Sequence, residues 1–86
     1  MTTLRQQFGK RVRQIRDERD QTQEEFAEIT GMSVDFLSLI ERGRNAPSFK
    51  KLELMTKGLG VSAAYLFTFE ASPSYRKKTR KLRGQR

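Results

Sequence analysis

The sequence from Thr22 to Ser48, TQEEFAEITGMSVDFLSLIERGRNAPS, carries the signals of two short helices separated by a glycine. Thr22 and Glu25 have the spacing of a capping box, in which each side chain accepts a hydrogen bond from the other residue's backbone amide. The first helix is therefore expected to begin at Gln23. It ends just before Gly31, which can adopt the left-handed conformation that a tight helix stop requires.

Ser33 is suited to be the N-cap of the second helix, which is expected to run to about Arg42 before Gly43 ends it. Two helices that cross at a steep angle need a small side chain near the contact, a turn that tolerates positive φ, and apolar anchors from the second helix. The residues that meet these demands stand 4, 8, 14 and 17 positions after Gln23 and are Ala27, Gly31, Leu37 and Ile40. The segment therefore predicts a helix-turn-helix, a motif whose second helix enters the DNA major groove.

Three further helices are predicted around this motif, because apolar residues recur at spacings of 3 and 4 on either side of it. One is expected from about Thr3 to Arg19, one opens at Pro47-Ser48, and a short one follows Ser62. Their apolar residues are Leu4, Phe8, Val12 and Ile15, then Leu52, Met55 and Leu59, then Tyr65, Leu66 and Phe67. The face formed by the first four of these residues should be covered by the rest of the chain. No segment alternates at period two. The expected fold class is therefore all-α, a compact bundle of five helices.

The composition of the 86 residues restricts the possible functions. A chain of this length with 35% hydrophobic residues can bury one modest helical core. The lack of Cys and His excludes disulfides, thiolate or imidazole metal sites, a Cys nucleophile and a His general base. We therefore expect no metal, no cofactor and no enzymatic activity. No apolar run approaches the ~20 residues of a membrane span and no signal peptide is recognisable, so we expect a cytoplasmic protein without a membrane partner.

The net charge of +8 is unevenly distributed along the chain. Residues 1–69 contain 11 Lys and Arg against 9 Asp and Glu, a net of +2, whereas residues 70–86 contain 7 against 1, a net of +6. The predicted organisation is a helical DNA-binding domain over residues 1–69 and a basic, flexible tail over residues 70–86. The tail has two interpretations: a solvated terminus that keeps the protein soluble, or an arm that neutralises DNA phosphates.

From Phe8 to Phe67 the chain resembles the Cro/C1-type (XRE) helix-turn-helix repressors. The motifs that carry the resemblance, in family order, are Gly9 to Arg16 with Arg19, Thr22 to Ala27, Gly31 to Ser33, Ile40 to Gly43, Pro47-Ser48, and Leu59 to Ser62. The resemblance implies a five-helix lambda-repressor-like domain that binds a partly palindromic operator in double-stranded DNA as a homodimer. The size is similar both to phage Cro-type repressors and to the controller proteins of restriction-modification systems.

The resemblance further implies that the start of the second helix of the motif faces the DNA bases. Val34 would pack on a thymine methyl group, Asp35 would accept from a cytosine amino group, and Ser38 would pair with several bases. The alternative for Asp35 is an interaction of its carboxylate with the helix dipole. The family often carries Gln, Asn, Arg or Lys at such positions. Because this chain has few hydrogen-bond donors there, its DNA recognition is expected to depend more on Arg42, Arg44 and DNA shape than on direct base contacts. The predicted base-reading residues are Ser33, Val34, Asp35, Ser38 and Leu39.

Contacts with the DNA backbone are expected from residues at the edge of the motif. Gln23 resembles the family glutamine that hydrogen-bonds a phosphate beside the helix N-terminus. Basic and amide side chains around the end of the second helix would position the protein without specifying a sequence. For the two lysines, a solvated charged surface is the alternative. The predicted backbone-contacting residues are Gln23, Arg42, Arg44, Asn45, Lys50 and Lys51.

Two further roles follow from the resemblance. Arg16 and Glu41 are expected to form an internal ion pair that fixes the reading helix against the first helix. In small members of the family the fifth helix and its flanks often supply the dimer contact, and aromatic residues favour interfaces. The predicted dimer interface is Tyr65, Phe67 and Phe69. The alternative is that Leu66 and Phe67 close the core.

The sequence leaves two functions open. The first is a sequence-specific DNA-binding transcriptional regulator, either a repressor or autoregulator, or an activator that touches RNA polymerase, with an antagonist protein as a further partner. The second is a protein-interaction adaptor or antitoxin-like module with the same fold, which the small number of hydrogen-bond donors on the reading helix favours. Binding that survives an excess of unrelated DNA discriminates the first from mere charge attraction.

Overall fold

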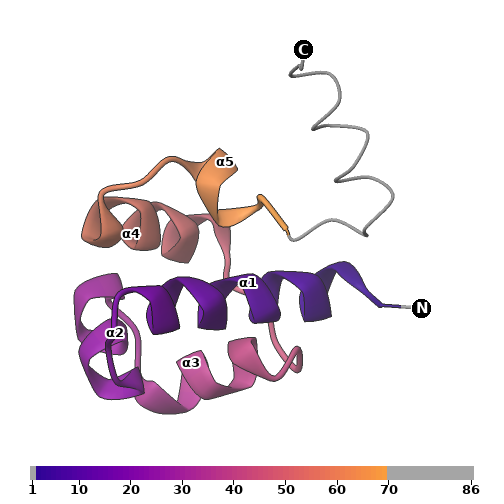
Figure 1. Cartoon of the computed structure of the whole chain (residues 1–86), viewed down its shortest axis with the longest axis horizontal. Coiled ribbons are helices and arrows are strands. Elements are labelled where there is room, and N and C mark those ends of the chain that lie inside the picture. The colour runs from indigo at the N-terminus through magenta and orange to yellow at the C-terminus, as the bar shows by residue number, and fades with distance from the viewer. Residues whose placement is uncertain (1, 70–86) are drawn as a thin grey trace.

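The computed structural model describes residues 2–69, and every regular element within them is helical (Figure 1). The five helices are α1 (Leu4–Glu18), α2 (Gln23–Thr30), α3 (Val34–Glu41), α4 (Phe49–Leu59) and α5 (Ala63–Leu66). The predicted all-α bundle of five helices is thus confirmed. The predicted basic tail, residues 70–86, lies outside the described residues.

Local capping signals set the limits of the helices. The Thr22 hydroxyl accepts a hydrogen bond from the Glu25 amide at 3.1 Å, and the Glu25 carboxylate accepts from the Thr22 amide at 2.9 Å. Gly31 ends α2 with φ of 71°, in the left-handed region that favours glycine. The predicted capping box and helix stop are therefore confirmed. A second capping box, formed by Thr3 and Gln6, starts α1 and was not predicted.

The core lies between α1, α2, α3 and α4, and every helix contributes to it. α1 contacts α3 and α5, while α2 packs against both α3 and α4. The buried hydrophobic residues are Phe8, Val12 and Ile15 of α1, Phe26 and Ala27 of α2, Met32 of the turn after α2, Leu37 and Ile40 of α3, Met55 and Leu59 of α4, and Leu66 of α5. In Figure 1, α1 crosses the middle of the molecule, with α3 on one side of it and α4 and α5 on the other.

Leu4 departs from the predicted core, because its side chain is 63% exposed. The expectation that the rest of the chain covers it was wrong. α1 has 15 residues and α3 has 8, which at 1.5 Å per residue correspond to about 22 Å and about 12 Å. The first turn of α1 therefore extends past the helix that covers its later turns.

None of the described helices is long and apolar enough to span a membrane.

Two glycines allow the helices to approach closely. A Cβ atom at Gly9 of α1 would overlap the carbonyl oxygen of Ile40 in α3, and a Cβ atom at Gly58 of α4 would overlap the carbonyl oxygen of Ile29 in α2. Since a protein interior is close-packed, even one methyl group at either place must push two helices apart. Gly9 therefore fixes the distance of α3 from α1.

Candidate DNA-binding interface

The helix-turn-helix presents one face of α3 to solvent because the other face is anchored in the core. Leu37 and Ile40 are completely buried, and Phe36 and Val34 are packed against the core in part. Ser33 and Asp35 are exposed, and Ser38 and Leu39 are half-buried. The outward surface of α3, called the reading face below, is therefore made by Asp35, Ser38 and Leu39 with Ser33 at its N-terminal edge. Of the five predicted base-reading residues, Val34 is the one that also contributes to the core.

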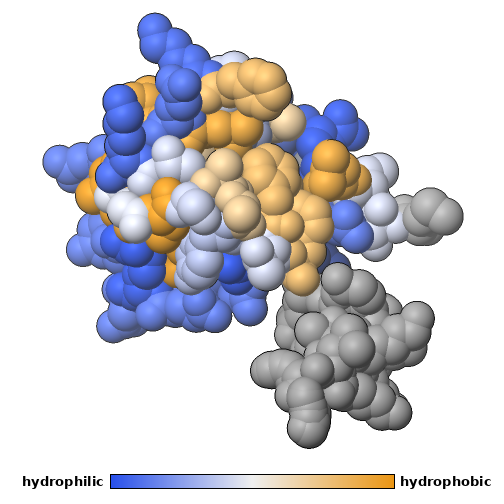
Figure 2. Space-filling view, turned by 90° about the horizontal axis from the view of Figure 1, so that it is seen from above, coloured by the Kyte–Doolittle hydropathy of each residue, from blue (hydrophilic) through white to orange (hydrophobic). Residues whose placement is uncertain are grey.

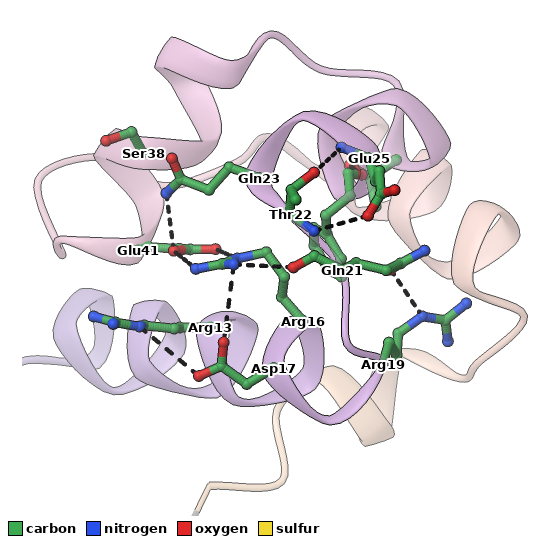
Figure 3. A network of polar contacts seen from close by, with 12 residues as sticks. Arg13, Arg16, Asp17, Arg19, Gln21, Thr22, Gln23, Glu25, Ser38 and Glu41 are labelled. Atoms are coloured by element: carbon green, nitrogen blue, oxygen red, sulfur yellow. Dashed lines mark hydrogen bonds and ion pairs between the residues drawn. The ribbon is translucent and has the colours of Figure 1, made fainter.

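A buried ion pair connects α3 to α1 (Figure 3). The Arg16 Nε atom donates to Glu41 Oε2 at 2.7 Å and the Nη2 atom donates to Glu41 Oε1 at 3.0 Å, a two-point contact between planar groups. The side chains of Arg16 and Glu41 are 13% and 5% exposed. The hydrogen bond with Glu41 raises the pKa of Arg16 above its ordinary value. The pair connects the C-terminal end of α3 to the last turn of α1.

Gln23 joins this network from α2, since its Nε2 atom donates to Glu41 Oε1 at 3.1 Å. Figure 3 shows the carboxamide extended from the start of α2 toward the carboxylate. One carboxylate thus receives donors from two other helices. The carboxamide nitrogen carries two hydrogens, and one of them suffices for Glu41. The sequence predicts that Gln23 hydrogen-bonds a DNA phosphate. In this structure its side chain connects α2 to α3 through the hydrogen bond to Glu41.

The predicted backbone-contacting residues other than Gln23 lie around the end of α3 and the start of α4. Arg42, Arg44, Asn45 and Lys50 are exposed. Lys51 is half-buried, and its Nζ atom donates to the carbonyl oxygen of Gly31 at 2.9 Å, so it caps the end of α2. Arg42 Nε donates back to the carbonyl oxygen of Ser38 at 3.3 Å. Lys51 therefore has a structural partner that the sequence did not indicate.

The residues predicted for the dimer contact lie around α5. The Phe67 ring contacts two other aromatic rings at tilted angles: Phe8, at a centroid distance of 4.9 Å and 34° between the planes, and Phe69, at 6.1 Å and 58°. The guanidinium of Arg11 lies 4.5 Å from the centre of the Tyr65 ring, and its Nε and Nη2 atoms donate to the Tyr65 carbonyl oxygen at 3.1 and 3.0 Å. Tyr65 and Phe67 are exposed, and Phe69 is half-buried. Leu66 is buried and closes the core, whereas Phe67 lies against the buried Phe8 and is itself 41% exposed.

Phe49 is the exposed apolar residue that the sequence analysis missed. It is the first residue of α4 and its side chain is 86% exposed. Figure 2, viewed onto α4 and α5, shows apolar side chains gathered in the middle of this face. Phe49 stands three residues before Leu52, so it continues the helical spacing of Leu52, Met55 and Leu59, and this pattern does not indicate its exposure.

Comparison with known proteins assigns the family. The family model described as helix-turn-helix, HTH_3, matches residues 12–66. The immunity repressor protein of Bacillus phage phi105 is 39% identical over 56 residues, which are 65% of this chain and 39% of the repressor's length. The control protein C.MunI of a Mycoplasma species is 32% identical over 69 residues, 79% of this chain and 93% of that protein.

A solved structure agrees with these sequence matches. A variant of the restriction-modification controller protein C.Esp1396I is similar with a TM-score of 0.67 at 33% sequence identity, over 78% of this chain and 89% of that one. Proteins of this kind are transcriptional regulators and not enzymes, in agreement with what the sequence predicts. The chain therefore belongs to the Cro/C1-type helix-turn-helix family of DNA-binding transcriptional regulators.

Proposed function

We propose that this protein regulates transcription by binding a partly palindromic operator as a homodimer, with α3 of each subunit in the major groove. The observation that carries the proposal is the anchoring of α3. Leu37 and Ile40 hold one side of the helix in the core, and the ion pair of Glu41 fixes its C-terminal end, while the reading face is left to solvent. A helix held rigidly by its inner side and free on its outer side is what major-groove insertion needs.

The proposed base contacts follow from the chemistry of the reading face. Asp35 accepts from the amino group of a cytosine, Ser38 donates to or accepts from several bases, and Leu39 packs against a thymine methyl group. Val34 is proposed to reach the bases only by the part of its side chain that the core leaves uncovered. The small number of donors means that phosphate contacts and DNA shape supply much of the affinity.

Phosphate contacts are proposed on both sides of α3. The backbone amides at the start of α2, with the second hydrogen of the Gln23 carboxamide, form an anion site on one side. Arg42, Arg44, Asn45 and Lys50 lie on the other side, after α3. Lys51 is proposed to contribute less to phosphate binding, because its ammonium group already donates a hydrogen bond to the Gly31 carbonyl oxygen. With this arrangement, the protein contacts the phosphates of both DNA strands that border the major groove.

One observation favours the second function, a protein-interaction adaptor. The reading face combines a carboxylate with a leucine, and an exposed carboxylate near DNA is repelled by the phosphates. If the reading face instead contacts a protein, sequence-specific DNA binding is absent and the basic residues bind duplexes without discrimination.

Selection of binding sites from random duplexes separates the two functions. A regulator enriches a palindromic consensus, and its binding survives an excess of unrelated DNA at 150 mM salt, a value on the order of physiological ionic strength. Leu39→Ala should change the consensus at one position in each half-site. Leu54→Ala, at an exposed leucine of α4, is the matched control and should leave the consensus intact. An adaptor enriches no sequence.

A further inference from the structure

A small polar pocket lies between the first half of α1 and the C-terminal end of α3. Its volume is about 240 Å³. Sites for small molecules usually enclose about 300–1,000 Å³ and are mostly apolar, so this pocket suits a single charged group better than a whole metabolite. We call it the Lys10 pocket. The residues that line it are Thr2, Gln6, Lys10, Glu41 and Arg42.

The Lys10 pocket is positively charged in spite of the carboxylate that lines it. The Glu41 side chain is only 5% exposed, and its oxygens accept hydrogen bonds from Arg16 and Gln23, so its charge is already compensated. Lys10 and Arg42 are exposed, and neither forms an ion pair with any residue among 2–69. Two unpaired cations that line one pocket attract an anion to it.

The sequence of α1 leaves Lys10 without an acidic neighbour on its own helix. Residues three and four positions apart are neighbours on a helix surface and can form ion pairs there. The residues at these positions around Lys10 are Gln6, Gln7, Arg13 and Gln14. No carboxylate of α1 is therefore placed to hold the ammonium group away from the pocket.

Gln6 supplies a neutral donor to the same pocket. Its Oε1 atom accepts a hydrogen bond from the Thr3 amide at 2.9 Å, as part of the capping box that starts α1. This bond fixes the orientation of the carboxamide and leaves the amide nitrogen to donate. The pocket thus combines two cations with a neutral donor, which is the chemistry that binds a phosphate group.

The two sides of the pocket are held together by backbone contacts. Gly43 follows Arg42, is buried, and has φ of 73°. A Cβ atom at Gly43 would lie 2.8 Å from the Gln6 Cγ atom, so the turn after α3 packs directly against the first turn of α1. The Arg5 Nε atom also donates to the Gly43 carbonyl oxygen at 3.2 Å. Because these contacts form within the chain, the pocket needs little reorganisation when it binds an anion.

We propose that the Lys10 pocket binds a phosphate group of the DNA backbone, with Lys10 and Arg42 as its cations and Gln6 as its neutral donor. The inference rests on the proposed DNA binding and adds α1 to the elements that contact DNA. Arg42 directly follows α3, so a phosphate held there lies beside the groove that α3 enters. The sequence analysis missed Lys10 because only the crossing of α1 and α3 brings it to one pocket with Arg42.

Titration of a single half-site at several salt concentrations tests the role of Lys10. Lys10→Gln should weaken binding by about 10-fold, because it removes a charged hydrogen bond. The slope of log affinity against log salt should fall in magnitude by about 0.9, the contribution of one neutralised phosphate. The preferred sequence should not change, since a phosphate contact carries no base information. Lys10→Arg retains the cation and should retain the slope.

Lys57→Gln is the matched control for this experiment. Lys57 is an exposed lysine of α4 that does not line the Lys10 pocket, and its replacement removes the same single charge. It should leave the affinity and the slope close to those of the wild type. Equal losses in Lys10→Gln and Lys57→Gln would mean that only the overall charge of the protein matters, which would overturn the inference.

Gln6→Glu tests the pocket with a variant that should fold as the wild type does. Glutamate also completes a capping box, so the Thr3 amide keeps its acceptor and thermal unfolding should not occur at a lower temperature. The new carboxylate repels a phosphate and can pair with Lys10 four residues later, so half-site affinity should fall by about 10-fold or more. A Gln6→Glu variant that binds DNA as tightly as the wild type would contradict the proposed site.

Free phosphate has the same chemistry as a DNA phosphate and is distinguished by a separate titration. Inorganic phosphate is added without DNA at constant ionic strength, and the NMR signals of the Lys10 side chain are followed. If these signals saturate while Lys10→Gln leaves DNA affinity unchanged, the pocket binds a free anion and the assignment to DNA is overturned.

Failure of this inference is distinguishable from failure of the proposed function. If Lys10→Gln binds the selected operator with wild-type affinity and slope, the inference is overturned and the regulator assignment stands. If the protein selects no sequence, but Lys10→Gln still lowers the salt slope on random duplexes, the proposed function is overturned and the inference is supported.

Discussion

At the scale of single residues, Glu41 is the polar group on which the position of α3 depends. Its carboxylate is almost fully buried and accepts hydrogen bonds from Arg16 and Gln23, which belong to two other helices. A buried charge with two donors is well satisfied, and the same charge without them is costly. The Arg16 guanidinium is a cation at neutral pH in any environment. Because Glu41 raises the pKa of Arg16 further, the stability that this cation contributes is lost only as the pH rises through that raised value.

We expect Glu41→Ala to lower the free energy of unfolding by about 3 kcal/mol, because the substitution leaves the Arg16 guanidinium without its partner in a mostly buried place. Urea denaturation measures this loss. Arg13→Ala is the control, since the Arg13–Asp17 bridge is 3.9 Å long, with side chains 67% and 61% exposed, and such bridges contribute about 0–1 kcal/mol. Unchanged unfolding of the Glu41→Ala variant together with an altered operator would contradict the structural role.

The residue scale also shows what the sequence could predict and what it could not. The caps at Thr22 and Gly31 were predictable, because a cap is decided by residues within four positions of it. The partner of Lys51 and the exposure of Leu4 were not, because both depend on which helix lies across from them. Phe49 belongs to the same class: a sequence gives its apolar character, and only the bundle shows that no other helix covers it.

At the scale of helices, the crossing of α1 and α3 positions the reading face. Gly9 allows the backbone of α1 to contact the carbonyl of Ile40, and the ion pair of Arg16 and Glu41 lies two turns further along α1. The two contacts restrain α3 at its C-terminal half. The N-terminal half, which carries Asp35, is restrained by Leu37 in the core and by the Gly31 turn. A change in the separation of α1 and α3 therefore displaces the whole reading face.

Gly9→Ala is expected to destabilise the protein by about 2 kcal/mol or more, because the new methyl group overlaps backbone that cannot move without shifting α3. It should also weaken operator binding of the fraction that stays folded. Gly60→Ala provides the comparison, since a Cβ atom there meets nothing within 4 Å and costs only about 1 kcal/mol for its φ of +69°. Thermal unfolding of both variants and titration of the operator check this. Equal losses in the two variants would refute the close contact as the cause.

At the scale of the whole molecule, the helical bundle and most of the net positive charge belong to different parts of the chain. Residues 1–69 carry a net charge of +2 and residues 70–86 carry +6. The described bundle supplies the reading face together with the exposed basic side chains that are proposed to contact phosphates, Arg42, Arg44 and Lys50. The predicted tail holds 7 of the 18 Lys and Arg residues, so we expect it to add to the electrostatic part of the DNA affinity.

Ending the chain at Phe69 is expected to make the salt dependence of operator affinity shallower, without changing the consensus sequence. If the tail cations neutralise phosphates, the slope of log affinity against log salt should fall in magnitude by up to about 6, since each neutralised phosphate contributes about 0.9. Titrations at several salt concentrations measure this. An unchanged slope would assign the tail to the solvated-terminus interpretation.

Operator spacing tests how the two subunits are joined. If two copies bind the operator as a rigid dimer, their α3 helices are separated by about one turn of DNA, ~34 Å, or a multiple of it, and the half-sites repeat at ~10 base pairs or a multiple. Inserting 5 base pairs between the half-sites turns the second one to the opposite side of the duplex. Operator affinity should then fall to that of one half-site. Gel-shift titration of the protein on both duplexes measures this, and wild-type affinity that is indifferent to the insertion would mean that the subunits bind as independent monomers.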